Sequence, residues 1–254
     1  MFALSAVAAR AVRAADARRF HAGAATSNIT PNLGCSLAGN MGDTLAQDVH
    51  DELHVRAIVL DNGSARVAMA TIDSCAVPRP ILDEAKRLIE QHTQIPASHV
   101  MLSATHSHSA PAATHLFQSL PDPKYTELLP IRIADAVRRA VKRLQPAQIG
   151  WGVGKEPRML FCRRYWMKPG TDMRNPLGGV DKLKTNPGIQ NPNVLKVAGP
   201  IDPDLGILAI QTTDGKPIAV WGNYALHYVG GTGPPGRQPS RPMPEPSMWS
   251  SESP

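Results

Sequence analysis

Residues 55–72 read VRAIVLDNGSARVAMATI, and this stretch decides the fold. Two short runs, 55–60 and 66–72, are rich in β-branched and apolar residues, which is typical of strands. Between them, Asp61-Asn62-Gly63-Ser64 is a turn sequence of the kind that joins the two strands of a hairpin. We therefore predict two adjacent strands here.

On the C-terminal side of this hairpin, the pattern alternates between helix and strand. Apolar residues recur at helical spacing in two segments, and short apolar runs separated by turn residues recur in the others. The spacing predicts helices over 81–91 and 125–144, and strands over 99–104, 148–153, 206–211 and 218–225. These elements, within residues 29–232, predict one α/β or α+β domain, with a mixed β-sheet as its core and helices covering the sheet.

Residues 155–200 differ from the rest, because they contain six prolines and show neither a helical nor a strand period. A connection of this length inside a domain is more often a functional loop than a plain linker. We therefore expect this segment to serve the functional site.

The composition excludes several classes of protein. The chain has 254 residues, 42% hydrophobic and 19% charged, which is typical of a globular protein, and no apolar run is long enough for a transmembrane helix. Its net charge is +6, of which residues 1–19 carry +3, and we find no basic stripe and only 5% aromatic residues. We therefore expect no nucleic-acid partner. The three cysteines form no CxxC pair, so neither a disulfide framework nor a cysteine zinc site is indicated.

The two ends are set apart from the domain. Residues 1–21 form a leader whose first 17 residues end in small residues, as at a signal-peptidase site, although the arginines follow the apolar run. A signal-peptide remnant, which would make the protein secreted or periplasmic, and a plain disordered leader both remain open. Residues 232–254 hold seven prolines and five serines, which predicts a disordered tail. The tail is either a natural terminus or the result of truncation or a shifted reading frame.

The chemistry concentrates in residues 103–111, SATHSHSAP. His106 and His108 follow a predicted strand, where α/β sheets place their ligand sites, and residues i and i+2 of an extended chain project from the same face. Imidazole suits zinc, and a hydrolytic zinc site usually has three protein ligands and an open position for water. His227, which follows another apolar strand, is the leading candidate for the third ligand.

Simpler interpretations exist for each of these residues. A histidine pair at this spacing is common as a surface or hydrogen-bonding pair. His50 and His54 flank acidic residues before a strand, as a solvated strand entry would. Arg163 and Arg164 are either a solvated basic pair or, because aromatic residues flank them within the long loop, one wall of a site.

Residues 103–111 closely resemble the signature SATHTHSxP of the neutral/alkaline non-lysosomal ceramidase family. Four other segments agree with that family in order and spacing. They are residues 24–39, similar to the opening loop of the family; 49–60, similar to its next strand; 161–164, with Cys162 where asparagine is usual; and 204–227, similar to the strand pair that delivers a third histidine.

The resemblance, which covers residues 22–231, implies a zinc-dependent amide hydrolase. It implies that His106, His108 and His227 bind Zn²⁺, and that Gly39, His50 and Arg163 line the catalytic pocket. The implied reaction is attack of a zinc-bound water on the N-acyl amide of ceramide or of a related lipid amide. The family also uses a glutamate, a tyrosine and a serine that come after the third histidine, and this chain ends 27 residues beyond His227.

Two hypotheses follow, a ceramidase-like amidohydrolase and a non-catalytic truncated remnant that keeps the fold and the metal. Because the later residues of the family are missing, we expect the 254-residue chain with zinc to show no amide hydrolysis above background. We also predict that Asp73, at the end of the strand 66–72, orients a metal ligand. The alternative is a carboxylate at the entry to the next helix. The substrate and the oligomeric state are left open by the sequence.

Overall fold

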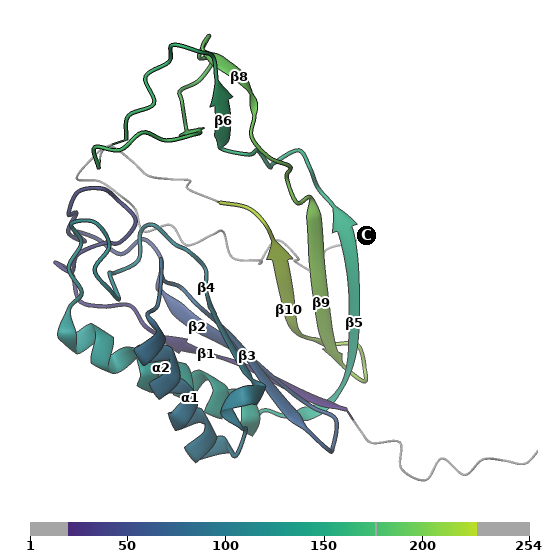
Figure 1. Cartoon of the computed structure of the whole chain (residues 1–254). Coiled ribbons are helices and arrows are strands. Elements are labelled where there is room, and N and C mark those ends of the chain that lie inside the picture. Colours follow the sequence, from purple (N-terminus) through teal and green to yellow (C-terminus); the bar gives the residue numbers. More distant parts are fainter. Residues whose placement is uncertain (1–19, 176, 228–254) are drawn as a thin grey trace, which may run out of the picture.

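The computed structural model describes residues 20–175 and 177–227. A seven-stranded sheet and two helices form the body of the molecule (Figure 1). Its strands are β1 (His21–Asn28), β2 (His54–Asp61), β3 (Arg66–Ile72), β4 (Val100–Ala104), β5 (Gln145–Lys155), β9 (Asp204–Thr212) and β10 (Pro217–Tyr224). Its helices are α1 (Arg79–Thr93) and α2 (Pro123–Lys142), and a short 3₁₀ helix, Ala97–His99, precedes β4.

The sheet is mixed and has the order β10-β9-β5-β1-β2-β3-β4. β3 and β4 pair in parallel, with α1 between them along the chain, whereas the other neighbouring strands of this sheet are antiparallel. The predicted α/β class, the mixed sheet with covering helices and the hairpin of β2 and β3 are therefore confirmed. The parallel pair brings the chain after β3 and the chain after β4 to the same edge of the sheet.

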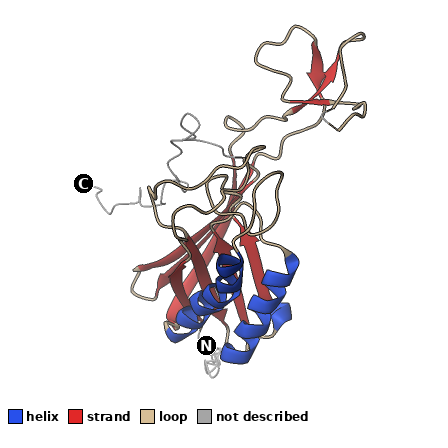
Figure 2. Cartoon of the chain, turned by 90° about the vertical axis from the view of Figure 1, so that its left-hand side faces the viewer, coloured by secondary structure: helices blue, strands red, loops and turns tan. Residues whose placement is uncertain are grey.

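Both helices cover one face of β1, β2 and β3 (Figures 1 and 2). Alternate residues of β2, including Val55 and Val59, point into this interface, and Ile133 of α2 meets them with no exposed surface. Gly23 of β1 allows the close approach of α2, because a Cβ at this position would lie 2.2 Å from the carbonyl oxygen of Ala140. Small residues in β1 thus determine how closely the helix packs.

The opposite face of the sheet holds a second, smaller core. Ala22 of β1 and Ile58 of β2 are buried there together with Ile210 of β9, and Trp221 of β10 packs against them. The strands β5, β9 and β10 therefore lie over the sheet face that the helices leave uncovered (Figure 1).

A second, three-stranded sheet lies in the connection between β5 and β9, residues 156–203, which we call the excursion. Its order is β7-β6-β8, formed by β6 (Arg164–Met167), β7 (Lys184–Thr185) and β8 (Val194–Val197). The excursion extends beyond the ends of β5 and β9, on the side away from the helices (Figures 1 and 2).

Two expectations from the sequence were wrong in detail. Residues 24–39 were expected to be an opening loop, but residues 24–28 belong to β1, which pairs with both β2 and β5. The segment 155–200 was expected to lack regular structure, but it contains three short strands. The proposed leader, except for Phe20 and His21, and the proposed tail lie outside the described residues. No helix in the described part of the chain is long and apolar enough to cross a membrane.

Candidate metal centre

The candidate site is built on the two parallel strands. In their register, Ile72 of β3 lies opposite Ala104 of β4, and the amide of Thr105 donates to the carbonyl of Ile72 at 2.9 Å. This hydrogen bond continues the pairing one residue beyond β4. Residues 73–75 and 105–108 consequently leave the sheet side by side, which brings Cys75 close to His106.

His106 and His108 face each other, although not for the reason that the sequence suggested. The backbone of His106 has φ 63°, in the left-handed region, so the pair does not follow the extended geometry expected from i and i+2 spacing. Their ring centroids are nevertheless 4.8 Å apart, and the two Nε2 atoms are 3.2 Å apart. Tetrahedral zinc with bonds of about 2.0 to 2.1 Å holds two ligand nitrogens about 3.3 Å apart, so this separation fits a shared ion.

His227 completes a triangle of imidazoles. Its ring centroid is 5.1 Å from that of His106 and 5.0 Å from that of His108. His227 follows β10 by three residues, and Tyr224 at the end of β10 donates a hydrogen bond to the carbonyl of Glu156 at the base of the excursion. The structure therefore brings together the three histidines that the sequence singled out.

Cys75, for which the sequence indicates no role in metal binding, also lies beside His106 and His108. Cys75, His106 and His108 each offer one ligand atom, and these atoms lie within 4.8 Å of one another. The Nδ1 of His106 lies 2.8 Å from the carbonyl oxygen of Cys75 and 3.7 Å from its Sγ. Because Nδ1 is positioned to donate to that carbonyl, Nε2 is the atom left for a metal.

Burial raises the pKa of the Cys75 thiol, which disfavours the thiolate form that binds metals. The raised pKa makes the thiol of Cys75 a weaker metal ligand than the two histidines of this group. Cys75 then contributes through its carbonyl, which orients His106. The signal that identifies Cys75 is its place after β3, next to the parallel strand that delivers His106.

Gly39 lies against the other histidine of the pair. Its φ is 98°, which glycine adopts without strain, and a Cβ there would lie 2.6 Å from Cγ of His108. A hydrogen bond also joins the His108 ring to the backbone of Gly39. Backbone groups thus orient both rings of the pair, as is usual for metal-binding histidines.

Both His108 and His227 favour the neutral form that binds metals. Burial is the main cause that lowers the pKa of His108, and His106 and His227 add to the effect, whereas the hydrogen bond with Gly39 opposes it. Partial desolvation likewise lowers the pKa of His227, although this residue is exposed, and the positive charge of Arg163 adds to the effect. The Nε2 atoms of His106 and His108 are close enough to share an ion, and the neutral form that His108 and His227 favour is the form that binds Zn²⁺.

The remaining site residues are placed as follows. Arg163, at the start of the excursion, is exposed and close enough to lower the pKa of both His108 and His227. His50 lies on the exposed loop before β2, where its Nδ1 is 2.7 Å from a carboxylate oxygen of Asp51. Arg163 is therefore a neighbour of the histidine cluster. The catalytic role of His50, Gly39 and Arg163 stays a prediction.

Asp73 does not contact a metal ligand in the way that was predicted. Its carboxylate is buried and accepts hydrogen bonds from the amide of His54 at 2.9 Å and from the guanidinium of Arg56 at 2.5 Å. Asp73 therefore ties the end of β3 to the start of β2. The carbonyl of Cys75, two residues later, is the group that accepts from His106.

Two polar atoms near the cluster are left for a ligand. Asn40, next to Gly39, and Thr105, next to His106, have a buried Nδ2 and Oγ1, respectively, with no hydrogen-bond partner among the described residues. Burying such atoms costs free energy unless a partner is supplied.

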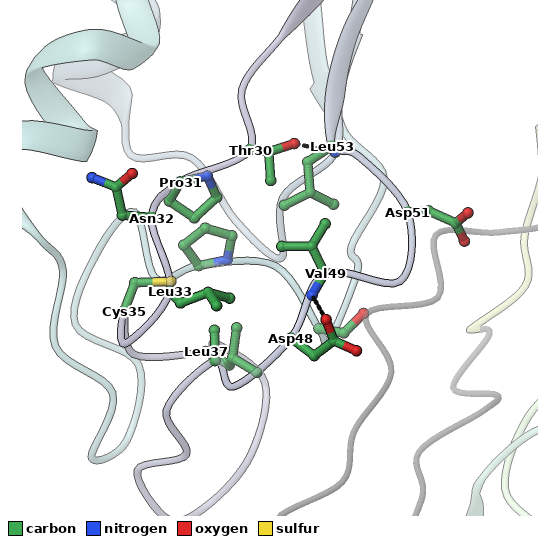
Figure 3. A pocket seen from close by; sticks show the side chains of 13 residues that line it. Thr30, Pro31, Asn32, Leu33, Cys35, Leu37, Asp48, Val49, Asp51 and Leu53 are labelled. Atoms are coloured by element: carbon green, nitrogen blue, oxygen red, sulfur yellow. Dashed lines mark hydrogen bonds between the residues drawn. The ribbon is translucent and has the colours of Figure 1, made fainter.

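A pocket lies beside the histidine motif (Figure 3). The chain after β1 and the loop before β2 form most of its wall, with Leu37, Val49 and Leu53 as apolar side chains, and Ser109 and Pro111 of the histidine motif line it too. Asp51, the partner of His50, also lines this pocket (Figure 3). The pocket thus joins the surroundings of His50 to the segment that carries the histidine pair.

The fold and the site together define an α/β protein with a candidate metal centre at the ends of two parallel strands. Two solved structures share this fold. The neutral ceramidase of Pseudomonas aeruginosa is 19% identical with a TM-score of 0.59, and the match covers 82% of this chain and 32% of that one. A structure described as a ceramidase complexed with C2 is 19% identical with a TM-score of 0.57, and the match covers 80% and 30% of the two chains.

At this level of identity the likeness establishes a ceramidase-like fold. The chain spans about a third of the length of these ceramidases, 32% and 30%. No family model matches the sequence, and no curated protein matches it significantly.

Proposed function

We propose that this protein is a zinc-dependent amidohydrolase that resembles neutral ceramidase and cleaves the N-acyl amide bond of ceramide or of a related lipid amide. The convergence of His106, His108 and His227 carries the proposal, because three imidazoles whose ring centroids lie within 5.1 Å of one another are a suitable ligand set for zinc. The ceramidase-like fold supports the choice of an amide as the substrate.

Each residue of the site has a distinct task in this reaction. His106, His108 and His227 hold the ion, and the carbonyl of Cys75 and the backbone of Gly39 keep two of these rings in place. Zinc, when bound, lowers the pKa of a water molecule to about 7 and polarises the amide carbonyl.

The cation of Arg163 is positioned beside His108 and His227, where it would stabilise the negative charge that develops on the amide oxygen. The buried amide of Asn40 is a second donor with no other partner among the described residues. His50, paired with Asp51 at the pocket, would contact the substrate as it enters.

A second function is a non-catalytic, metal-binding protein of the same fold. A hydrolase also needs a general base, which a carboxylate commonly supplies. The metal group found among the described residues contains cysteine and histidine and no carboxylate.

Zinc content and hydrolysis measured on the same sample separate these functions. The purified chain is loaded with zinc, its zinc stoichiometry is determined, and release of fatty acid from an N-acylsphingosine is followed. We expect one zinc ion per chain, lost in His106→Ala and retained in His92→Ala, a matched change of an exposed histidine at the end of α1.

Zinc-dependent hydrolysis that disappears in His106→Ala would support the hydrolase. Zinc binding without hydrolysis would support the non-catalytic protein. A chain that binds no zinc would contradict both.

A further inference from the structure

The excursion carries an excess of positive charge. Residues 156–203 contain eight Lys and Arg against four Asp and Glu. Two of the eight cations are paired within the excursion, Arg158 with Glu156 and Arg174 with Asp172. The other six make no ion pair with a described residue: Arg163, Arg164, Lys168, Lys182, Lys184 and Lys196.

Exposed aliphatic residues occupy the loops of the same segment. Leu177 is 95% exposed, Ile189 is 97% exposed and Val180 is 77% exposed, all in the connections between β6, β7 and β8. Leu177 and Ile189 are the most exposed large hydrophobic side chains of the described residues, whereas Ile133 of α2 has no exposed surface. Aliphatic side chains with so little burial are a feature of interaction surfaces.

The small sheet places aromatic and cationic side chains together. In its register Trp166 lies opposite Lys196, and Tyr165 lies opposite Lys184. Residues opposite each other share a face of the sheet, so each face carries one aromatic and one cation. Trp and Tyr beside Lys is the combination that concentrates at the boundary between lipid and water.

We propose that the excursion docks on the surface of an anionic lipid bilayer. The aliphatic tips Leu177 and Ile189 would enter the boundary between headgroups and acyl chains, and the unpaired cations would lie over the anionic headgroups. The three-stranded sheet is too small to bury either of its faces against itself. A bilayer covers such a surface and matches its charge.

This docking would hold the histidine cluster close to the membrane. Tyr224, three residues before His227, donates a hydrogen bond to the carbonyl of Glu156, the first residue of the excursion, so the base of the excursion adjoins the histidine cluster. The proposal rests on the exposed side chains and charges of the excursion and not on the proposed zinc chemistry. It can therefore hold for a catalytic and for a non-catalytic protein.

Vesicle sedimentation of the full chain tests the proposal. The vesicles are phosphatidylcholine alone or phosphatidylcholine with a minority of phosphatidylglycerol, at low and at physiological salt. We expect binding to the anionic vesicles, weaker binding at higher salt, and little binding to phosphatidylcholine alone.

Two sets of variants separate the apolar and the ionic contributions. Leu177→Asp combined with Ile189→Asp should reduce binding at least tenfold, whereas Ile131→Asp, which changes a half-exposed isoleucine of α2, should leave binding unchanged. Lys182→Gln and Lys196→Gln should each reduce binding about fivefold, and Lys142→Gln at the end of α2 should not. The changed loop residues are exposed, and circular dichroism checks that the fold is kept.

Three results would overturn the proposal. The first is equal binding to both kinds of vesicle by the wild type and by the variants, or no binding at all. The second is tighter binding of a single-stranded oligonucleotide that does not depend on Leu177 and Ile189, which would assign the cations to a nucleic acid. The third is a dimer in solution that dissociates in the Leu177→Asp and Ile189→Asp variant, without any binding to vesicles, which would assign the surface to a second copy of the chain.

Discussion

The body of the molecule and the excursion use apolar residues in opposite ways. In the body, Val55, Val59 and Ile133 are fully buried between the sheet and the helices, where they stabilise the fold. In the excursion, Leu177 and Ile189 are almost fully exposed, and they contribute little to the stability of the chain. The comparison indicates that the body holds the histidines in place, whereas the excursion is available for contact with another surface.

The largest effect should come from the closest contact in the body. In Gly23→Ala the new Cβ would lie 2.2 Å from the carbonyl oxygen of Ala140 and 2.8 Å from the carbonyl carbon of Arg143. Because both are backbone atoms, the end of α2 would have to shift to relieve the contact. We expect a loss of about 4 kcal/mol or more in the free energy of unfolding, measured by urea denaturation. Gly150→Ala in β5, where a Cβ meets nothing within 4 Å, is the control and should change stability little. Equal stability of the two variants would show that α2 does not approach β1 so closely.

A matched pair of truncations compares the two regions directly. Ile133→Ala removes a side chain with no exposed surface and should cost about 3 kcal/mol in the free energy of unfolding. Leu195→Ala in β8 removes a side chain that is 58% exposed and should cost less than about 0.5 kcal/mol. A large loss in Leu195→Ala would mean that the excursion has a core of its own.

The sequence predicts the body much better than the excursion. The strands β2, β3 and β4 and both helices have clear periods and turn signals, and they occur within about three residues of the predicted bounds. The strand β1 was missed, because contact with α2 requires small residues such as Gly23, and these lack the β-branched signal of a strand. The strands β6, β7 and β8 are two to four residues long and lie among prolines, so no period could reveal them.

The candidate site was predictable in its side chains but not in its backbone. His106, His108 and His227 follow strands, and their positions sufficed to bring them together in one hypothesis. The carbonyl of Cys75 and the close approach of Gly39 depend on local φ values and on the register of β3 and β4, for which a single sequence carries no signal. For the same reason Asp73 was chosen as the group that orients a ligand, although its carboxylate is held by His54 and Arg56.

A smaller effect, on zinc affinity, is expected from a change at Gly39, whose backbone lies against the ring of His108. In Gly39→Ala the added Cβ would lie 2.6 Å from Cγ of His108 in a backbone with φ 98°, so the ring or the loop must shift. We expect zinc affinity, measured by competition with a chelator, to fall by about 10 to 100-fold, the usual effect of disturbing a group that orients a ligand. Gly42→Ala changes a glycine three residues away whose Cβ would meet nothing within 4 Å, and it should bind zinc as the wild type does. Unchanged affinity in Gly39→Ala would remove the proposed role of this contact.

The smallest effect should be a dependence of stability on pH in the zinc-free protein. Burial lowers the pKa of His108 and His227 in the folded chain, so the unfolded chain binds more protons as the pH falls through the ordinary histidine pKa of about 6.5. When the unfolded state binds more protons, the free energy of unfolding rises with pH, so the apo protein should lose stability between about pH 7 and pH 5. Replacing both rings, in His108→Asn combined with His227→Asn, should make this loss smaller, whereas His92→Asn at the exposed end of α1 should not. Urea denaturation at the two pH values provides the measurement. An equal loss of stability in the wild type and in the double variant would show that the two rings are as well solvated in the folded chain as in the unfolded one. The argument that burial prepares the rings for metal binding would then be wrong.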